Sequence, residues 1–353
     1  MRVFKNRVAF EVARAIKALL KAGAGFVSGG EAVLAPRPGV SKTSGQNDTR
    51  GRRAKQAGQR VVRKGRETMM RARRRMSGGE ADGIDPGNIV WIFGAGRTGS
   101  TWLSQMMGEL EGHYVWFEPW VGALFDPYHL RLEDRKGKHF ILSPRYRSTW
   151  LRSIRSFVLD GAGARFPEVS KDGYLAIKEP GGSVGARLLM EALPESRMIL
   201  LVRDPRDVVA SWVDASRAGG WQAERKKKRN AAPLPVEAPA RRYLRNVTEA
   251  KKAYDSHEGR KVLVRYEELR ADALGTMRRI YSTLEMPVEQ GELLRAVEKH
   301  SWESLPEEQK GEGKFYRKAE PGGWREDLTP EQVETVEKIT APLLQELYPT
   351  DAP

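Results

Sequence analysis

A glycine-rich segment followed by two hydroxyl residues is the strongest candidate for anion binding in this sequence. Residues 89–103 read IVWIFGAGRTGSTWL, a pattern typical of a strand, a tight turn and the start of a helix. Glycines bring backbone N–H groups against an anion, and the helix N-terminus adds a favourable dipole. Ser100 and Thr101 can cap the helix or hydrogen-bond the same anion. We therefore expect a phosphate-binding loop here.

The loop differs from a nucleoside triphosphate loop in one position. Its glycines fit the spacing G-x-x-x-x-G, but Ser100 stands where those loops carry the lysine that reaches the β- and γ-phosphates. The cation lies inside the loop instead, at Arg97. This arrangement argues against ATP or GTP hydrolysis and suits a ligand with a 5′-phosphosulfate group.

A second segment pairs a cation with a hydroxyl. Residues 200–212 read LLVRDPRDVVASW, typical of a buried strand, an Arg-Asp-Pro turn and a helix. Arg203 would lie at the carboxyl end of the strand and Ser211 two turns into the helix, on the side that can face the same anion. The alternative is a plain strand–helix junction in which Asp204 caps the helix and Pro205 occupies its first turn.

Together with two later segments, these residues resemble the sulfotransferases that use 3′-phosphoadenosine 5′-phosphosulfate (PAPS). GRTGSTWL (96–103) is similar to the family's 5′-phosphosulfate loop. The resemblance implies that Arg203 and Ser211 bind the 3′-phosphate. It implies that Trp102 packs beside the adenine and that the phosphosulfate is held by Arg97, Thr98, Gly99, Ser100 and Thr101.

The two later segments extend the resemblance to residue 325. VRYEEL (264–269) is similar to the family strand whose tyrosine approaches the adenine, which would be Tyr266. FYRKAEPGGWRED (315–327) resembles the loop that wraps the 3′-phosphate, with Arg317 and Lys318 matching. Ala319 stands where the family usually has glycine, and Gly323 where it has aspartate. If a positive φ is needed at Ala319, the loop fits differently.

Sulfuryl transfer resembles phosphoryl transfer, so it depends on positioning, charge stabilisation and a base for the acceptor proton. No metal is needed if cations cover the leaving phosphate. Arg97 is one such cation, and Lys178 is the other because it ends an apolar strand at the sheet's carboxyl edge. The resemblance implies that this lysine neutralises the bridging oxygen.

The general base is one of two glutamates. Cytosolic relatives place a histidine two residues after the lysine, where this chain has Pro180. Glu118 follows the strand 113–117 among apolar residues that would favour its role as base. Glu179 adjoins Lys178, but successive strand residues point to opposite faces. We expect Glu118 to be the base and keep Glu179 as the alternative.

Aromatic residues indicate the acceptor, which we expect to be a hydroxyl or amine of a carbohydrate, a glycolipid or another small molecule. Four tryptophans could line an acceptor pocket or lie in the core, and flat rings suit a sugar or an aromatic alcohol: Trp116, Trp120, Trp150 and Trp221. Residues 117–119 (FEP) are closer to carbohydrate-type sulfotransferases than to phenol-type ones.

Short apolar runs alternate with helical patterns after residue 84, which predicts an α/β fold of the P-loop type, a parallel sheet with helices on both faces. Residues 219–240 contain prolines and five consecutive cations, and we expect a loop there. The expected strands are 89–93, 113–117, 174–178, 198–202 and 262–264, and the expected helices are 100–110, 183–193, 205–217, 240–256 and 267–284.

The charge divides the chain in two. Residues 1–80 hold 20 of the 61 Lys and Arg residues and only 5 of the 46 Asp and Glu residues, so they carry the whole net charge of +15. We expect residues 1–83 to be a basic extension, with an amphipathic helix at 3–21 and disorder after it. That helix would meet a membrane surface, its own domain or a partner. Residues 84–353 would form the single sulfotransferase domain.

The chain contains no cysteine, which excludes disulfides and thiolate chemistry, and its five histidines show no metal spacing. With no apolar run of membrane-spanning length and no signal peptide, we expect a cytoplasmic protein, peripheral at most to a membrane through residues 1–21. Two other functions compete. A P-loop small-molecule kinase is disfavoured by Ser100, and a protein that binds nucleic acid or membrane through its extension leaves the later motifs unexplained.

Overall fold

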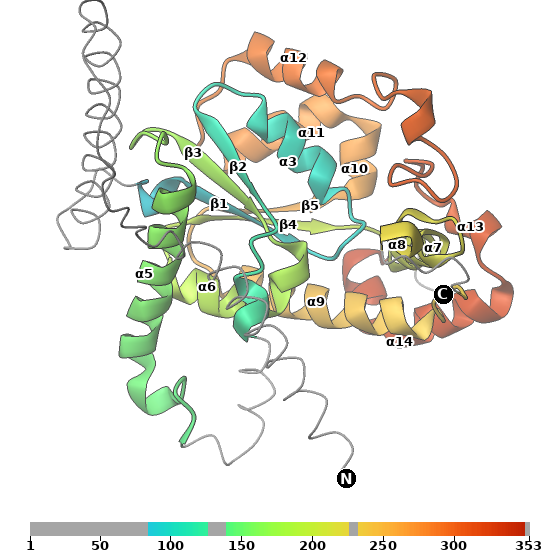
Figure 1. Cartoon of the computed structure of the whole chain (residues 1–353), viewed down its shortest axis with the longest axis horizontal. Helices are drawn as coiled ribbons and strands as arrows, with labels where there is room; N and C mark the ends of the chain where they lie inside the picture. Colours follow the sequence, from blue (N-terminus) through green and yellow to red (C-terminus); the bar gives the residue numbers. More distant parts are fainter. Residues whose placement is uncertain (1–83, 126–138, 226–231, 350–353) are drawn as a thin grey trace, which may run out of the picture. The chain divides into compact units, whose positions relative to one another are not determined.

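The computed structural model describes residues 84–125, 139–225 and 232–349. Five apolar runs form one parallel sheet in the order β2-β3-β1-β4-β5. The strands are β1 (Ile89–Gly94), β2 (His113–Phe117), β3 (Tyr174–Lys178), β4 (Arg197–Val202) and β5 (Lys261–Arg265). All five predicted strands are confirmed, and so is the α/β class with helices on both faces (Figure 1).

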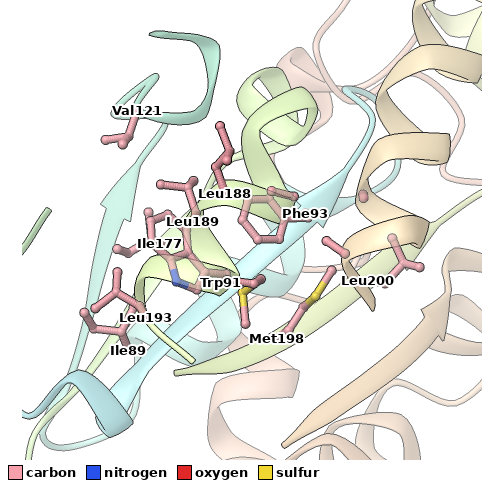
Figure 2. Packing of buried hydrophobic residues seen from close by; sticks show 14 of the residues in the cluster. Ile89, Trp91, Phe93, Val121, Ile177, Leu188, Leu189, Leu193, Met198 and Leu200 are labelled. Atoms are coloured by element: carbon pink, nitrogen blue, oxygen red, sulfur yellow. The ribbon is translucent and has the colours of Figure 1, made fainter. Parts of the chain in front are cut away.

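Alternation along β1 divides the core into two layers. Ile89, Trp91 and Phe93 face one layer, whereas Val90 and Ile92 face the other. The first layer is closed by α5 (Arg147–Arg165), α6 (Ala186–Ala192), α9 (Glu237–Ser256) and α14 (Pro330–Leu347). Figure 2 shows Trp91 and Phe93 packed in it with Leu188 and Leu189 of α6. The second is closed by α3 (Ser100–Gly108), α10 (Tyr266–Ala271), α11 (Ala273–Thr283) and α12 (Gln290–Lys299).

The strand order fixes where a ligand can bind. From the central strand β1 the chain crosses through α3 to the edge strand β2, returns to β3 on one side of β1, and then continues to β4 on the other side. In open parallel sheets such a reversal opens a crevice beyond the carboxyl ends of the strands. The phosphate loop, Lys178 and Arg203 all follow or end strands at this edge.

The segment 219–240 differs from the expected loop. Residues Trp221–Arg225 form a short helix, α8, and α9 begins at Glu237. The helix expected at 183–193 is a 3-10 turn, η5 (Pro180–Gly185), followed by α6, and the one expected at 267–284 is divided into α10 and α11. The amphipathic helix at 3–21 and the rest of the extension lie outside the described residues. Among the described helices, none has the length and apolarity to cross a membrane.

We expect Gly94→Ala to destabilise the fold by roughly 3 kcal/mol or more. A Cβ on Gly94 would lie 2.1 Å from the carbonyl oxygen of Leu201 in β4, and the residue has a φ of +145°. Gly163→Ala in α5 is the matched control, because no atom lies within 4 Å of its added Cβ. It should stabilise the helix by about 0.5–1 kcal/mol. Urea unfolding measures both, and equal stabilities would contradict the close packing of β1 on β4.

Candidate functional site

The phosphate loop presents backbone N–H groups without a side-chain cap. Gly99 is the N-cap of α3, with a φ of +85°, and no side chain caps the helix. Ser100 and Thr101 line the cleft beyond the loop. The hydroxyl of Thr98 instead donates to the carbonyl of Ala95 at 2.8 Å, and Thr98 does not line the cleft. The N-terminus of α3 is therefore uncapped where Ser100 and Thr101 line the cleft, whereas the Thr98 side chain does not reach the cleft.

The cleft has a volume of about 580 Å³. The four segments singled out in the sequence converge on it, together with the ends of β2 and β3. Among its described lining residues Glu118 is the one carboxylate, whereas eight are cations: Arg97, Lys178, Arg203, Arg225, Arg242, Arg270, Arg317 and Lys318. Such a cleft attracts anions and concentrates them.

Arg97 lies where three segments meet. Its Nε donates to Ser211 Oγ of α7 (Pro205–Ser216) at 2.9 Å, and another guanidinium nitrogen donates to the carbonyl of Phe315 at 2.6 Å. Burial, helped by Arg203 and Arg317, lowers the pKa of Arg97 to about 10. The guanidinium is therefore charged at neutral pH. A bound anion would offset the desolvation cost of burying this charge.

Arg203 is held beside the loop with one donor left unsatisfied. Its guanidinium lies 4.2 Å from the ring centroid of Tyr266 and 3.7 Å from the carboxylate of Asp207. Its Nε is buried and has no hydrogen-bond partner among the described residues. A buried donor without a partner is costly unless a ligand satisfies it.

Two aspartates of α7 hold the C-terminal segment against the cleft. Buried Asp207 accepts hydrogen bonds from the N–H groups of Gly322 (2.8 Å) and Trp324 (3.0 Å). Asp214, seven residues later, accepts one from Gly313 at 3.0 Å. Sequence reasoning missed this role, although Asp207 lies in the first turn of the predicted helix, four residues after Arg203.

The C-terminal loop itself brings Arg317 and Lys318 to the cleft. Arg317 is paired with Asp327, and Lys318 lies 2.8 Å from Glu326 and 3.2 Å from Asp327. Ala319 has a φ of +53°. The loop therefore does need a positive φ where the family usually has glycine, and here alanine adopts it at some conformational cost.

Buried Lys178 and half-buried Glu118 form an ion pair at the carboxyl ends of β3 and β2. The amino group of Lys178 contacts the carboxylate of Glu118 and lies 3.9 Å from the ring centroid of Phe117. Burial is the main reason that the pKa of Lys178 is lowered. The backbone N–H of Glu118 donates to the carbonyl of Lys178 at 2.9 Å, which holds the two residues in register.

Glu179 points away from the cleft. Its carboxylate accepts the N–H of Trp120 at 3.0 Å, and its backbone follows β3 into the η5 turn. A Cβ on Gly182 would lie 1.9 Å from this carboxylate, so the glycine makes room for it. Burial raises the pKa of Glu179 to about 7. Glu179 therefore holds the segment that carries Glu118 and Trp120, both of which have positive φ angles.

Of the four tryptophans considered for the acceptor pocket, two line the cleft and two pack in the core. Trp120 and Trp221 line the cleft. Trp150 is buried in the core, with its indole N–H donated to the carbonyl of Ser143, and Trp116 packs on the same core. For Trp116 and Trp150 the core alternative therefore holds, because neither residue lines this cleft.

The structure also brings to the cleft residues that the motifs did not indicate. Trp212 and Arg242 come from α7 and α9, and Arg270 comes from α10. No local sequence signal distinguishes them from surface residues of an amphipathic helix. Thr98 is the one residue expected to bind the cofactor that does not line the cleft. The remaining expected residues all line it: Arg97, Gly99, Ser100, Thr101, Trp102, Arg203, Ser211, Tyr266, Arg317 and Lys318.

Comparison with known proteins gives one family. The family model described as the sulfotransferase domain matches residues 88–348. No curated protein sequence matches the chain well enough to count as a relative. Among solved structures, sulfotransferase STF9 from Mycobacterium avium aligns over 73% of this chain and 76% of its own, with 17% identity and a TM-score of 0.47. Mouse sulfotransferase SULT7A1, complexed with PAP, aligns over 74% and 86%, with 12% identity and a TM-score of 0.44.

We expect the unfolding free energy of the wild type to fall, relative to Glu179→Gln, by about 2–3 kcal/mol between pH 5 and pH 8. The pKa of Glu179 is about 7 in the folded chain, above the ordinary value of 4.5. The native state therefore favours the protonated form, and its advantage is lost as pH rises through 7. Urea unfolding at both pH values measures the difference, with the exposed Glu334→Gln as control. Parallel pH profiles would contradict the burial of a carboxyl group here.

Proposed function

This chain belongs to the sulfotransferase family, and on that premise we propose that it transfers a sulfuryl group from PAPS to a hydroxyl or amine of a carbohydrate-type acceptor. The observation that carries the proposal is the convergence of four separate motifs on one cationic cleft. The carbohydrate-type acceptor is supported by the FEP segment and by Trp120 and Trp221 at the cleft.

The residues at the cleft fit PAPS. The uncapped N-terminus of α3 offers backbone donors to an anionic group, and five cations that line the cleft belong to the motifs. We propose that Arg203 and Ser211 bind the 3′-phosphate with Arg317 and Lys318, that Tyr266 and Trp102 flank the adenine, and that the loop residues 97–101 hold the phosphosulfate.

PAPS supplies the sulfuryl group and a phosphate that leaves with the bridging oxygen. The acceptor oxygen forms the new S–O bond as the bond to phosphate breaks. In our proposal Glu118 takes the acceptor proton, because its carboxylate lines the cleft beside Lys178. Lys178 and Arg97 balance the charge of the leaving phosphate, so no step requires a metal.

A kinase fits this cleft less well, because Ser100 replaces the lysine that a γ-phosphate requires. We also propose that the enzyme is cytoplasmic, and the lack of cysteine is compatible with that location. Residues 1–83 form an extension in our proposal, and residues 84–353 form the catalytic domain. The charge excess of residues 1–80 supports that division, and the amphipathic pattern at 3–21 supports peripheral membrane contact.

Arg203→Ala should weaken binding of 3′,5′-adenosine bisphosphate (PAP) by about 1.5–3 kcal/mol, because it removes a charge-assisted hydrogen bond. Calorimetric titration measures it. Adenosine 5′-phosphate is the matched control ligand, since it lacks the 3′-phosphate and should lose little affinity. If the affinities for both ligands fell equally, Arg203 would not be the 3′-phosphate ligand. It would instead act by holding the ring of Tyr266 in position. Titration with ATP tests the kinase alternative.

Glu118→Gln should leave PAP affinity intact and lower turnover by about 10²–10⁴-fold, because glutamine keeps the shape and removes the basicity. Radiolabelled PAPS and a panel of p-nitrophenyl glycosides provide the assay. Glu179→Gln is the comparison variant. If Glu118→Gln turns over normally and Glu179→Gln does not, the role of base passes to Glu179.

A further inference from the structure

The cleft contains more positive charge than the cofactor motifs account for. Five of its eight cations belong to those motifs. Of the remaining three, Arg270 supports the C-terminal loop, since its Nε donates to the carbonyl of Ala319 at 3.0 Å and its guanidinium lies 3.8 Å from Glu303. Arg225 and Arg242 have neither a motif role nor an ion pair among the described residues.

Arg242 is positioned by a rigid helix. In α9 the next residue, Tyr243, donates its hydroxyl to the carbonyl of Arg203 at 2.7 Å, and Asn246 donates to the carbonyl of Pro180 at 3.1 Å. The guanidinium of Arg242 lies 5.6 Å from the ring centroid of Trp212. The backbone of Arg242 is therefore held against the cleft, and its exposed side chain lines the cleft beside Trp212.

This charge lines the same cleft as Glu118 and Trp120. Burial lowers the pKa of Arg242, Arg245 adds to that shift, and the charge of Glu118 opposes it. Arg242 is thus within electrostatic reach of the proposed base. Arg225 reaches the same cleft from the end of α8, one turn after Trp221.

Flat apolar surface lies in the same cleft. The side chains of Phe117 and Trp120 are 52% and 48% exposed, although both line the cleft beside Lys178 and Glu118. Exposed rings favour the face of a ring in the ligand. A guanidinium binds a carboxylate or a sulfate through two parallel hydrogen bonds. A neutral acceptor would partly desolvate these arginines and offer them no counter-charge.

We propose that the acceptor is an anion, a hydroxyl-bearing ring that carries a carboxylate or sulfate ester. The negative group binds Arg242 with the help of Arg225, the ring lies on Trp120, and the hydroxyl reaches Glu118. The proposal rests on the proposed function and adds a subsite to its cleft. PAPS does not need these two arginines, because its three anionic groups already face five motif cations.

Two ligands that differ only in the anionic group test the proposal. The PAP-loaded enzyme is titrated by calorimetry with p-nitrophenyl β-D-glucuronide and with p-nitrophenyl β-D-glucoside. We expect the glucuronide to bind at least about tenfold more tightly at low salt, with the preference shrinking as salt screens the charges. Arg242→Gln should remove most of this preference and leave glucoside and PAP affinities unchanged. The control is Arg241→Gln, an exposed neighbour on α9 that does not line the cleft.

Several results would overturn the anionic subsite: equal affinities for the two glycosides, no binding of the glucuronide at millimolar concentration, or a preference that survives Arg242→Gln. If Arg241→Gln lowered the preference for the glucuronide as much as Arg242→Gln does, the preference would come from general surface charge and not from a subsite. A loss of PAP affinity in Arg242→Gln would assign the arginine to the cofactor. Failure of the wild type to bind PAP would instead overturn the proposed function, so the two failures are distinguishable.

Discussion

Repulsion between like charges is the constraint on which the cleft depends. Eight cationic side chains line one cavity, and without a ligand their charges raise the energy of the fold. The surrounding structure opposes this with carboxylates and ring faces placed at individual cations. Glu118 pairs with Lys178, Asp327 with Arg317, and Asp207 lies near Arg203. The rings of Tyr266 and Phe315 lie against Arg203 and Arg97.

These partners are also what keeps the cleft specific for an anion. Most of the carboxylates approach the cations from outside the cavity, where they restrain position and leave part of each charge facing inward. Glu118 is the exception, because it lines the cleft and shares the ammonium group of Lys178. If PAPS binds as proposed, its leaving phosphate and Glu118 share the ammonium group of Lys178, and the bound donor would weaken the ion pair between Lys178 and Glu118. This one ion pair would then couple binding of the donor to binding of the acceptor beside Glu118.

The sequence predicted the parts of this arrangement that local patterns specify. Apolar runs placed all five strands, and the loop, Arg203 and Tyr266 follow directly from residue types at strand ends. What could not be predicted depends on contacts between distant segments. Trp150 is enclosed by α5 packing, and Arg242 meets the cleft only because α9 crosses the ends of β3 and β4. Strand alternation placed Glu179 opposite Lys178, but only the structure revealed that it binds the backbone of Trp120.

The attachment of the C-terminal loop to α7 bears on how this enzyme can diverge. Asp207 and Asp214 hold the loop through the amide groups of Gly313, Gly322 and Trp324. Side chains add to this attachment, because the Trp324 ring lies 4.3 Å from the guanidinium of Arg206 and Glu312 pairs with Arg217 at 2.7 Å. Any residue except proline supplies such an amide, provided that its backbone can adopt the local conformation. Gly313 and Gly322 have φ angles of +72° and +83°, which favour glycine, so the freedom to mutate is confined to the other positions of the loop. The ligand contacts that such positions make can therefore change while the backbone attachment of the loop to α7 is kept.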